Sequence, residues 1–142
     1  MEFLLYLSTQ QMDVYKLISK KVRVVENAPI CRKYDIFGFY SSEQKVLTMC
    51  TETIKKFPNL YVNTNETLMH ESVHVAQSCK SGFAFLDPFR ISSSLMSLSY
   101  QKENDLKKVI AFDPRLKDAD REAFWMEDKP EKVKYVVQKY CF

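Results

Sequence analysis

The sequence predicts one α+β domain, with a small sheet in its first half and mostly helices in its second. The chain has 142 residues, the length of one domain, and 46% of them are hydrophobic, which is enough for a buried core. Stretches rich in β-forming residues are confined to positions 22–51, whereas helical patterns dominate after residue 65. Because no repeat or glycine- or serine-rich linker divides the chain, residues 1–142 are expected to form a single domain.

The first half is expected to follow the order helix, strand and hairpin. Apolar residues at helical spacing predict a helix over residues 9–21. The sequence VRVVE at residues 22–26 indicates a short strand, which Pro29 ends. Two β-rich arms around a polar turn then predict a β-hairpin, with its arms at residues 35–40 and 45–51.

The second half carries start and stop signals for several helices. Asn65 can cap the N-terminus of the first of these helices, and Gly82 lies where that helix is expected to stop. Asp113 followed by Pro114 is typical of the start of another helix. The expected helices span residues 66–80, 92–109, 114–128 and 130–140.

Composition argues against nucleic-acid and membrane partners. The net charge is +3, the lysines are scattered, and the basic clusters are too short for a nucleic-acid-binding stripe. No segment approaches the length of apolar chain that spans a bilayer. The start, MEFLLYLSTQQ, lacks a basic lead and has too short an apolar run for a secretory signal. The four cysteines are widely spaced, so free buried thiols and a cytoplasmic location are expected.

Residues 67–79, TLMHESVHVAQSC, contain both histidines of the chain. On a helix, His70 and His74 lie on the same face, and two imidazoles placed in this way can bind one Zn²⁺. Glu71 lies about 100° round the helix from His70. It is therefore beside the metal, where it can act as the general base for a zinc-activated water. The apolar neighbours make this helix largely buried, and a buried histidine pair needs a partner. We expect one Zn²⁺ per chain.

This stretch resembles the active-site helix of the zincin metallopeptidases, and the hairpin before it resembles that of the small zincins. The resemblance implies a zincin-like domain, in which a small antiparallel or mixed sheet and its hairpin pack on the His-Glu-x-x-His helix. It also implies that the strand upstream of this helix lies at the edge of the cleft and pairs with an extended peptide substrate. The substrate-binding residues expected on this strand are Lys45, Val46, Leu47, Thr48 and Met49.

A catalytic zinc site takes three protein ligands and keeps one open position. Because the chain has no third histidine, the metzincin type is excluded, and the third ligand has to be a carboxylate or a cysteine. The gluzincin resemblance implies a downstream Glu-x-x-Ala helix, whose closest match is Asp120 to Ala123. Asp120 shares a helix face with Ala123 but is one methylene shorter than the family's glutamate, whereas Glu122 has the usual length and points about 100° away. The sequence leaves Asp120 and Glu122 as alternatives.

Glu127 and Gln77 are candidates for roles beside the metal ligands. Glu127 follows Asp120 on the same helical face and is a candidate for orienting a ligand histidine. Gln77 follows His74 on the ligand side, where it either hydrogen-bonds near the metal or serves packing alone. A cysteine-ligated peptide deformylase is a weaker alternative, because its glycine-rich loop and Glu-Gly-Cys motif are missing.

The predicted function is therefore that of a zinc-dependent metallohydrolase, a metallopeptidase that cleaves peptide bonds in a peptide or protein substrate. In this interpretation Glu71 is the catalytic base, and the metal ligands are His70, His74 and either Asp120 or Glu122. The alternative is a catalytically inactive zincin-like protein that binds metal or a partner. Loss of activity in Glu71→Gln with zinc retained would distinguish the enzyme from the inactive protein.

Overall fold

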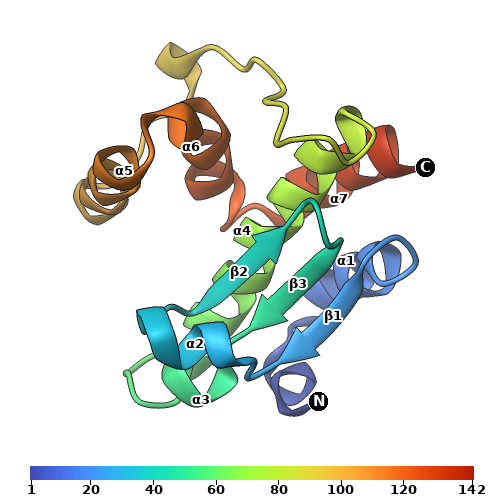
Figure 1. Ribbon diagram of the computed structural model, residues 1–142, viewed down its shortest axis with the longest axis vertical. Helices are drawn as coiled ribbons and strands as arrows, with labels where there is room; N and C mark the ends of the chain where they lie inside the picture. The colour runs from blue at the N-terminus through green and yellow to red at the C-terminus, as the bar shows by residue number, and fades with distance from the viewer.

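The computed structural model describes residues 1–142 and shows a three-stranded sheet packed on one long helix, with further helices around it (Figure 1). The predicted α+β class is confirmed. In chain order, the elements are η1 (Glu2–Tyr6), α1 (Thr9–Ile18), β1 (Arg23–Glu26), α2 (Pro29–Tyr34), β2 (Gly38–Ser41), β3 (Val46–Met49), α3 (Thr51–Ile54), α4 (Leu60–Lys80), η2 (Ser93–Leu95), α5 (Tyr100–Phe112), η3 (Pro114–Leu116), α6 (Lys117–Met126) and α7 (Pro130–Cys141).

The sheet has the strand order β1-β3-β2, with β1 parallel and β2 antiparallel to β3. The hairpin predicted from the sequence is therefore present, although its strands are shorter than expected. The prediction that the strand at Lys45–Met49 forms the edge of a cleft is wrong. Because β3 pairs with β1 on one side and β2 on the other, its backbone groups are already used by the sheet. The edge strand of the hairpin is β2.

Helix α4 begins at Leu60, earlier than the sequence predicts, and its N-cap residue is Asn59. Asn65, the expected cap, lies inside the helix and joins it to the N-terminal segment. Its side-chain oxygen accepts a hydrogen bond from the Ser8 N–H at 3.0 Å, and its amide nitrogen donates to the Tyr6 carbonyl oxygen at 3.0 Å. Since these partners are far away in the chain, the local capping pattern could not reveal this use of Asn65.

The other predicted helices are present with shifted ends: α1 stops at Ile18 and not at residue 21, and α5 runs to Phe112 and not to residue 109. Helix α5 begins at Tyr100, where the Ser99 side chain accepts a hydrogen bond from the Lys102 N–H. Most of the segment between α4 and α5 is irregular. Asp113 accepts the Arg115 N–H as predicted, but the helix it caps starts with the 3-10 turn η3 before α6. The short helices α2 and α3 were not predicted.

Helix α4 lies at the centre of the core, between the sheet and helix α7 (Figure 1). Apolar residues of β3, α4 and α7 are fully buried together, because α4 is enclosed on most sides by the sheet and the other helices. The buried residues that carry this packing are Leu47, Met49, Leu68, Met69, Val73, Val75, Ala76, Val133 and Val137.

The expectation of free cysteines is wrong. Cys31 is bonded to Cys50 and Cys79 to Cys141, with Cα–Cα distances of 5.5 and 5.2 Å. The partners are 19 and 62 residues apart in the sequence, so only folding brings them together. Disulfides are typical of oxidising compartments, and the thiol-based argument for a cytoplasmic location therefore fails. None of the helices is long and apolar enough to cross a membrane.

Candidate metal centre

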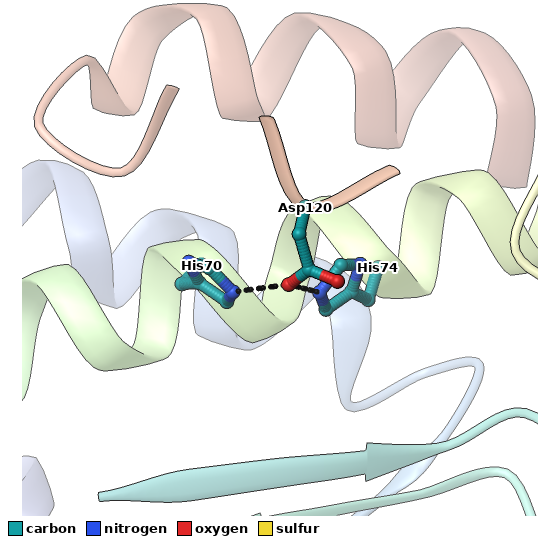
Figure 2. Close-up of side chains that lie close together, drawn as sticks. All are labelled: His70, His74 and Asp120. Atoms are coloured by element: carbon teal, nitrogen blue, oxygen red, sulfur yellow. Dashed lines mark hydrogen bonds and ion pairs between the residues drawn. The ribbon is translucent and has the colours of Figure 1, made fainter. Parts of the chain in front are cut away.

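Helices α4 and α6 bring together three side chains that can ligate a metal. His70 and His74 lie one turn apart on α4, and Asp120 lies in the first turn of α6. The Nε2 atoms of both histidines are 3.3 Å from the same Asp120 oxygen, Oδ1, which lies between the two rings (Figure 2). One ligand atom from each residue lies within 4.8 Å of the others.

These separations are compatible with a shared metal ion. A hydrogen bond from a protonated imidazole to a carboxylate is normally about 2.7–2.9 Å long, and the observed distances are 3.3 Å. In a tetrahedral zinc site with bonds of about 2.0–2.1 Å, neighbouring ligand atoms lie about 3.3 Å apart. Two imidazole nitrogens and one carboxylate oxygen are also a ligand set that zinc accepts, so the residues present fit a zinc ion.

The charges of the three side chains shift one another's pKa values. Burial alone would lower the pKa of His70, but the contacts with Asp120 and Glu127 outweigh it and raise this pKa to about 10. The pKa of His74 is raised in the same way, against the effect of burial, by the charge of Asp120. Burial would raise the pKa of Asp120, yet the two histidines hold it well below its usual range. The cluster therefore favours positive charge on its two imidazole rings.

Gln77 and Glu122 form a polar chain on one side of the centre. The Nδ1 atom of His74 lies 2.7 Å from the Gln77 side-chain oxygen, and the Gln77 amide nitrogen donates to Glu122 at 2.9 Å. Glu122 also accepts the main-chain N–H groups of Phe89 and Ile91, at 2.9 and 3.3 Å. Its carboxylate is thus used by the segment after α4. Of the two predicted third ligands, the structure brings Asp120, and not Glu122, to the histidines.

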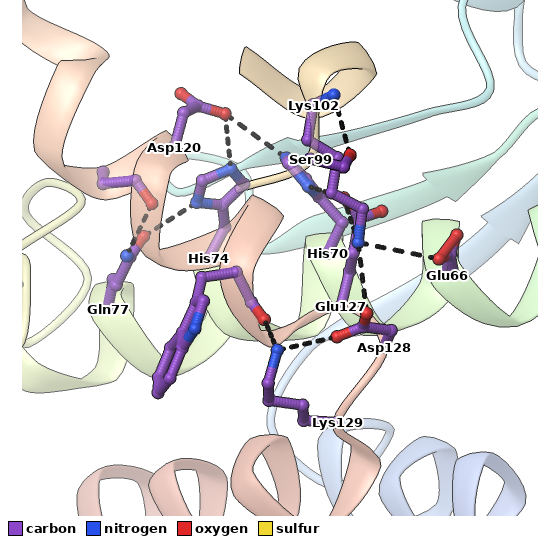
Figure 3. Close-up of polar contacts among 12 residues, drawn as sticks. Glu66, His70, His74, Gln77, Ser99, Lys102, Asp120, Glu127, Asp128 and Lys129 are labelled. Atoms are coloured by element: carbon purple, nitrogen blue, oxygen red, sulfur yellow. Dashed lines mark hydrogen bonds and ion pairs between the residues drawn. The ribbon is translucent and has the colours of Figure 1, made fainter. Parts of the chain in front are cut away.

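Glu127 and a lysine lie on the His70 side of the centre. The Glu127 carboxylate is 3.9 Å from the Nδ1 atom of His70, close enough for an ionic contact but too far for a hydrogen bond. Lys102, from α5, lies 3.8 Å from Glu127 and also pairs with Glu66 and Asp128 at 3.7 and 3.5 Å (Figure 3). This lysine offsets part of the negative charge beside His70.

Glu71 lies between the two histidines in sequence and is buried, with 8% of its surface exposed. Burial raises the pKa of its carboxyl group, while the neighbouring histidines oppose this shift. A carboxyl group with a raised pKa is suited to taking up and releasing a proton near neutral pH. Strand β2 lies directly against this part of α4, because a Cβ atom on Gly38 would be 3.3 Å from the Glu71 Cγ atom.

Two neighbours of the centre were missed by sequence reasoning. Phe124 packs edge-on against the His70 ring, with centroids 4.6 Å apart. Its helical spacing from Asp120 was a signal that could have assigned it to the site. Lys102 offered no such signal, since its link to His70 runs through Glu127 on another helix.

The fold and the centre together define a small α+β domain with a His-His-Asp cluster on two packed helices. The chain belongs to a family described as a domain of unknown function (DUF8637), whose model matches residues 3–142. Comparisons with curated proteins and with solved structures gave no significant match.

Proposed function

We propose that this protein is a zinc-dependent hydrolase of peptide bonds, with one Zn²⁺ per chain held by His70, His74 and Asp120. The observation that carries the proposal is the approach of both Nε2 atoms to one oxygen of Asp120, at 3.3 Å each. The His-Glu-x-x-His spacing and the resemblance to the zincins support the same assignment independently of this geometry.

The roles of the residues follow from their chemistry. Zinc in such a site acts as a Lewis acid, which lowers the pKa of water towards about 7 and polarises a carbonyl group. Glu71 accepts the proton of the attacking water and delivers it to the nitrogen of the leaving amine. Burial raises the pKa of Glu71, which helps the protonated carboxyl form to persist until that second transfer.

The proposed substrate is an extended segment of a peptide or protein. Strand β2 is at the edge of the sheet and passes close to Glu71 at Gly38. A peptide that adds to this edge would be held by main-chain hydrogen bonds, which impose little choice of sequence. The proposal therefore assigns to β2 the role that the sequence suggested for Lys45–Met49.

Metal binding without catalysis is the second candidate. The observation that favours it is the burial of the centre, because His74 and Asp120 are each only 6% exposed. Such burial restricts the access of water and substrate, whereas a catalytic site needs an open position for them.

The first test is the zinc content of the purified protein, measured by elemental mass spectrometry without a histidine tag. We expect about one equivalent in the wild type, as for a single set of three protein ligands with one open position. The content should fall close to zero in His74→Ala and Asp120→Ala. Asp118→Ala is the matched control, because Asp118 lies in the same helical turn but is exposed. Absence of zinc from the wild type, even after zinc is offered, would overturn the proposal.

The second test separates the two candidates. Glu71→Gln should keep its zinc and lose peptide hydrolysis by roughly 10²–10⁴-fold, the usual contribution of a general base. The assay is cleavage of a mixed peptide library, followed by mass spectrometry. If the zinc-loaded wild type cleaves no more than Glu71→Gln does, metal binding without catalysis is the correct function.

A further inference from the structure

We propose that Gln77 is a positioning residue that sets the tautomer of His74, so that the Nε2 atom of this histidine is free to ligate the metal. The inference rests on the proposed zinc site and assigns a role to a residue outside its three ligands. It is carried by the direction of one buried side-chain amide.

The direction of the Gln77 amide is determined by two acceptors. The side-chain nitrogen lies 3.0 Å from the Ala119 carbonyl oxygen and 2.9 Å from the Glu122 Oε1 atom. A carbonyl oxygen can only accept, and the same Glu122 atom already accepts the Phe89 N–H at 2.9 Å. Only an NH₂ group can face these two atoms. Turning the amide over would place its oxygen against both acceptors and leave buried groups unpaired.

The fixed amide in turn dictates which His74 nitrogen carries a proton. With its nitrogen committed to the acceptors on α6, the Gln77 oxygen faces His74, 2.7 Å from the Nδ1 atom. An amide oxygen accepts only, so Nδ1 must carry the hydrogen. In a neutral imidazole the other nitrogen then keeps its lone pair, and that atom is the Nε2 that faces Asp120. Metal-ligating histidines commonly donate their second N–H in this way.

Burial holds these hydrogen bonds in a single arrangement. Gln77 is 0% and Glu122 1% exposed, so water cannot replace either partner. A fully satisfied buried network holds its members in one arrangement, whereas a half-satisfied one is costly. His70 provides a contrast within the same centre, because its Nδ1 atom is 3.9 Å from Glu127 and has no comparable bond. Glu122 is therefore the anchor of the Gln77 amide and not a metal ligand.

The test compares Gln77→Met with the wild type. Methionine is similar in size to glutamine but cannot accept the Nδ1 hydrogen. We expect zinc affinity, measured by competition with a chelator, to fall roughly 10- to 100-fold, as is typical when the hydrogen-bond partner of a ligand histidine is lost. Gln138→Met, on the exposed face of α7, is the matched control and should bind zinc like the wild type.

Nuclear magnetic resonance gives a second readout that packing alone would not change. In the zinc-loaded wild type, ¹H–¹⁵N spectra should show a protonated Nδ1 on His74 that exchanges slowly with water. In Gln77→Met this exchange should become fast, while the His70 signals stay as they are. An unprotonated Nδ1 in the wild type overturns the inference without any variant, so the test does not depend on the folding of Gln77→Met.

The outcomes distinguish this inference from the proposed function. If the wild type binds no zinc, both fail. If the wild type and Gln77→Met bind zinc equally well and show the same His74 signals, only the role of Gln77 is overturned.

Discussion

At the scale of single residues, Asp120 is a shared cause of the raised pKa values of His70 and His74. Its Oδ1 atom contacts both histidines, and the residue is 6% exposed, so little solvent screens these interactions. The aspartate is one methylene shorter than the glutamate that the gluzincin resemblance implies. It still reaches the histidines because α6 packs closely on α4, where Ala119 and Ala123 are small and buried.

The metal-free protein should lose stability as the pH rises. The pKa of His70 is raised from 6.5 to about 10 in the folded state, so folding strengthens proton binding. The contribution of His70 protonation to the stability of the fold is fully present below the unfolded-state pKa, and it is lost as the pH rises through the folded-state pKa. Between about pH 6.5 and 10 the melting temperature should therefore fall. Thermal unfolding across this range measures the effect.

Two comparisons control this prediction. Asp120→Asn lacks the charge that retains the proton, so its melting temperature should depend less on pH than that of the wild type. Zinc competes with the proton for the same nitrogens, so zinc affinity should rise over the same range. A wild-type melting temperature that follows that of Asp120→Asn at every pH would contradict the prediction.

At the scale of elements, the contact between β2 and α4 depends on a glycine. A Cβ atom at Gly38 would lie 2.6 Å from the Thr67 Cγ2 atom, which is closer than real Cβ contacts allow. Thr67 is β-branched and lies on a helix, so its side chain has little freedom to move aside. The absence of a side chain at Gly38 is what lets the edge strand lie against the helix beside Glu71.

Gly38→Ala should destabilise the fold by about 1–3 kcal/mol, the usual cost of adding a methyl group to a closely packed site. Urea denaturation measures this cost. Thr67→Ser removes the Cγ2 atom, so the double variant should recover much of the loss, and Thr67→Ser alone supplies the matched control. Additive effects of the two changes would show that the clash is not the cause.

At the scale of the whole molecule, two disulfides link distant parts of the chain around α4. The bond between Cys79 and Cys141 joins the C-terminal ends of α4 and α7, just beyond the metal centre. The bond between Cys31 and Cys50 joins α2 to the end of β3. Both restrict the unfolded chain, and the larger loop restricts it more.

Loss of either disulfide should lower the free energy of unfolding. Chain-entropy arguments give about 3 kcal/mol for the 19-residue separation and about 4 kcal/mol for the 62-residue one. The measurement is chemical denaturation of Cys31→Ser/Cys50→Ser and of Cys79→Ser/Cys141→Ser, each against the wild type. Addition of a reductant should reduce the stability of the wild type and leave a variant without both bonds unchanged. Equal stability of all these proteins would show that the bonds do not form.

The sequence predicted those features that depend on neighbouring residues. The spacing of His70 and His74 places them on one face of α4, because helical periodicity acts over four residues. The hairpin and the cap at Asp113 were likewise predicted from local signals. Asn65 shows the limit of such signals, since a good capping residue lies inside α4 and binds the N-terminal segment instead.

The tertiary structure alone decided the features that join distant segments. Asp120 and Glu122 are close in sequence and similar in chemistry, and only the packing of α6 on α4 determines which of them faces the histidines. The central position of β3 and the two disulfides were hidden for the same reason. The sequence by itself determined the α+β class and the histidine pair, because local propensity and helical period specify them. The packing of α6 on α4 brings Asp120 to the histidine pair, and this side chain lies some fifty residues further along the chain.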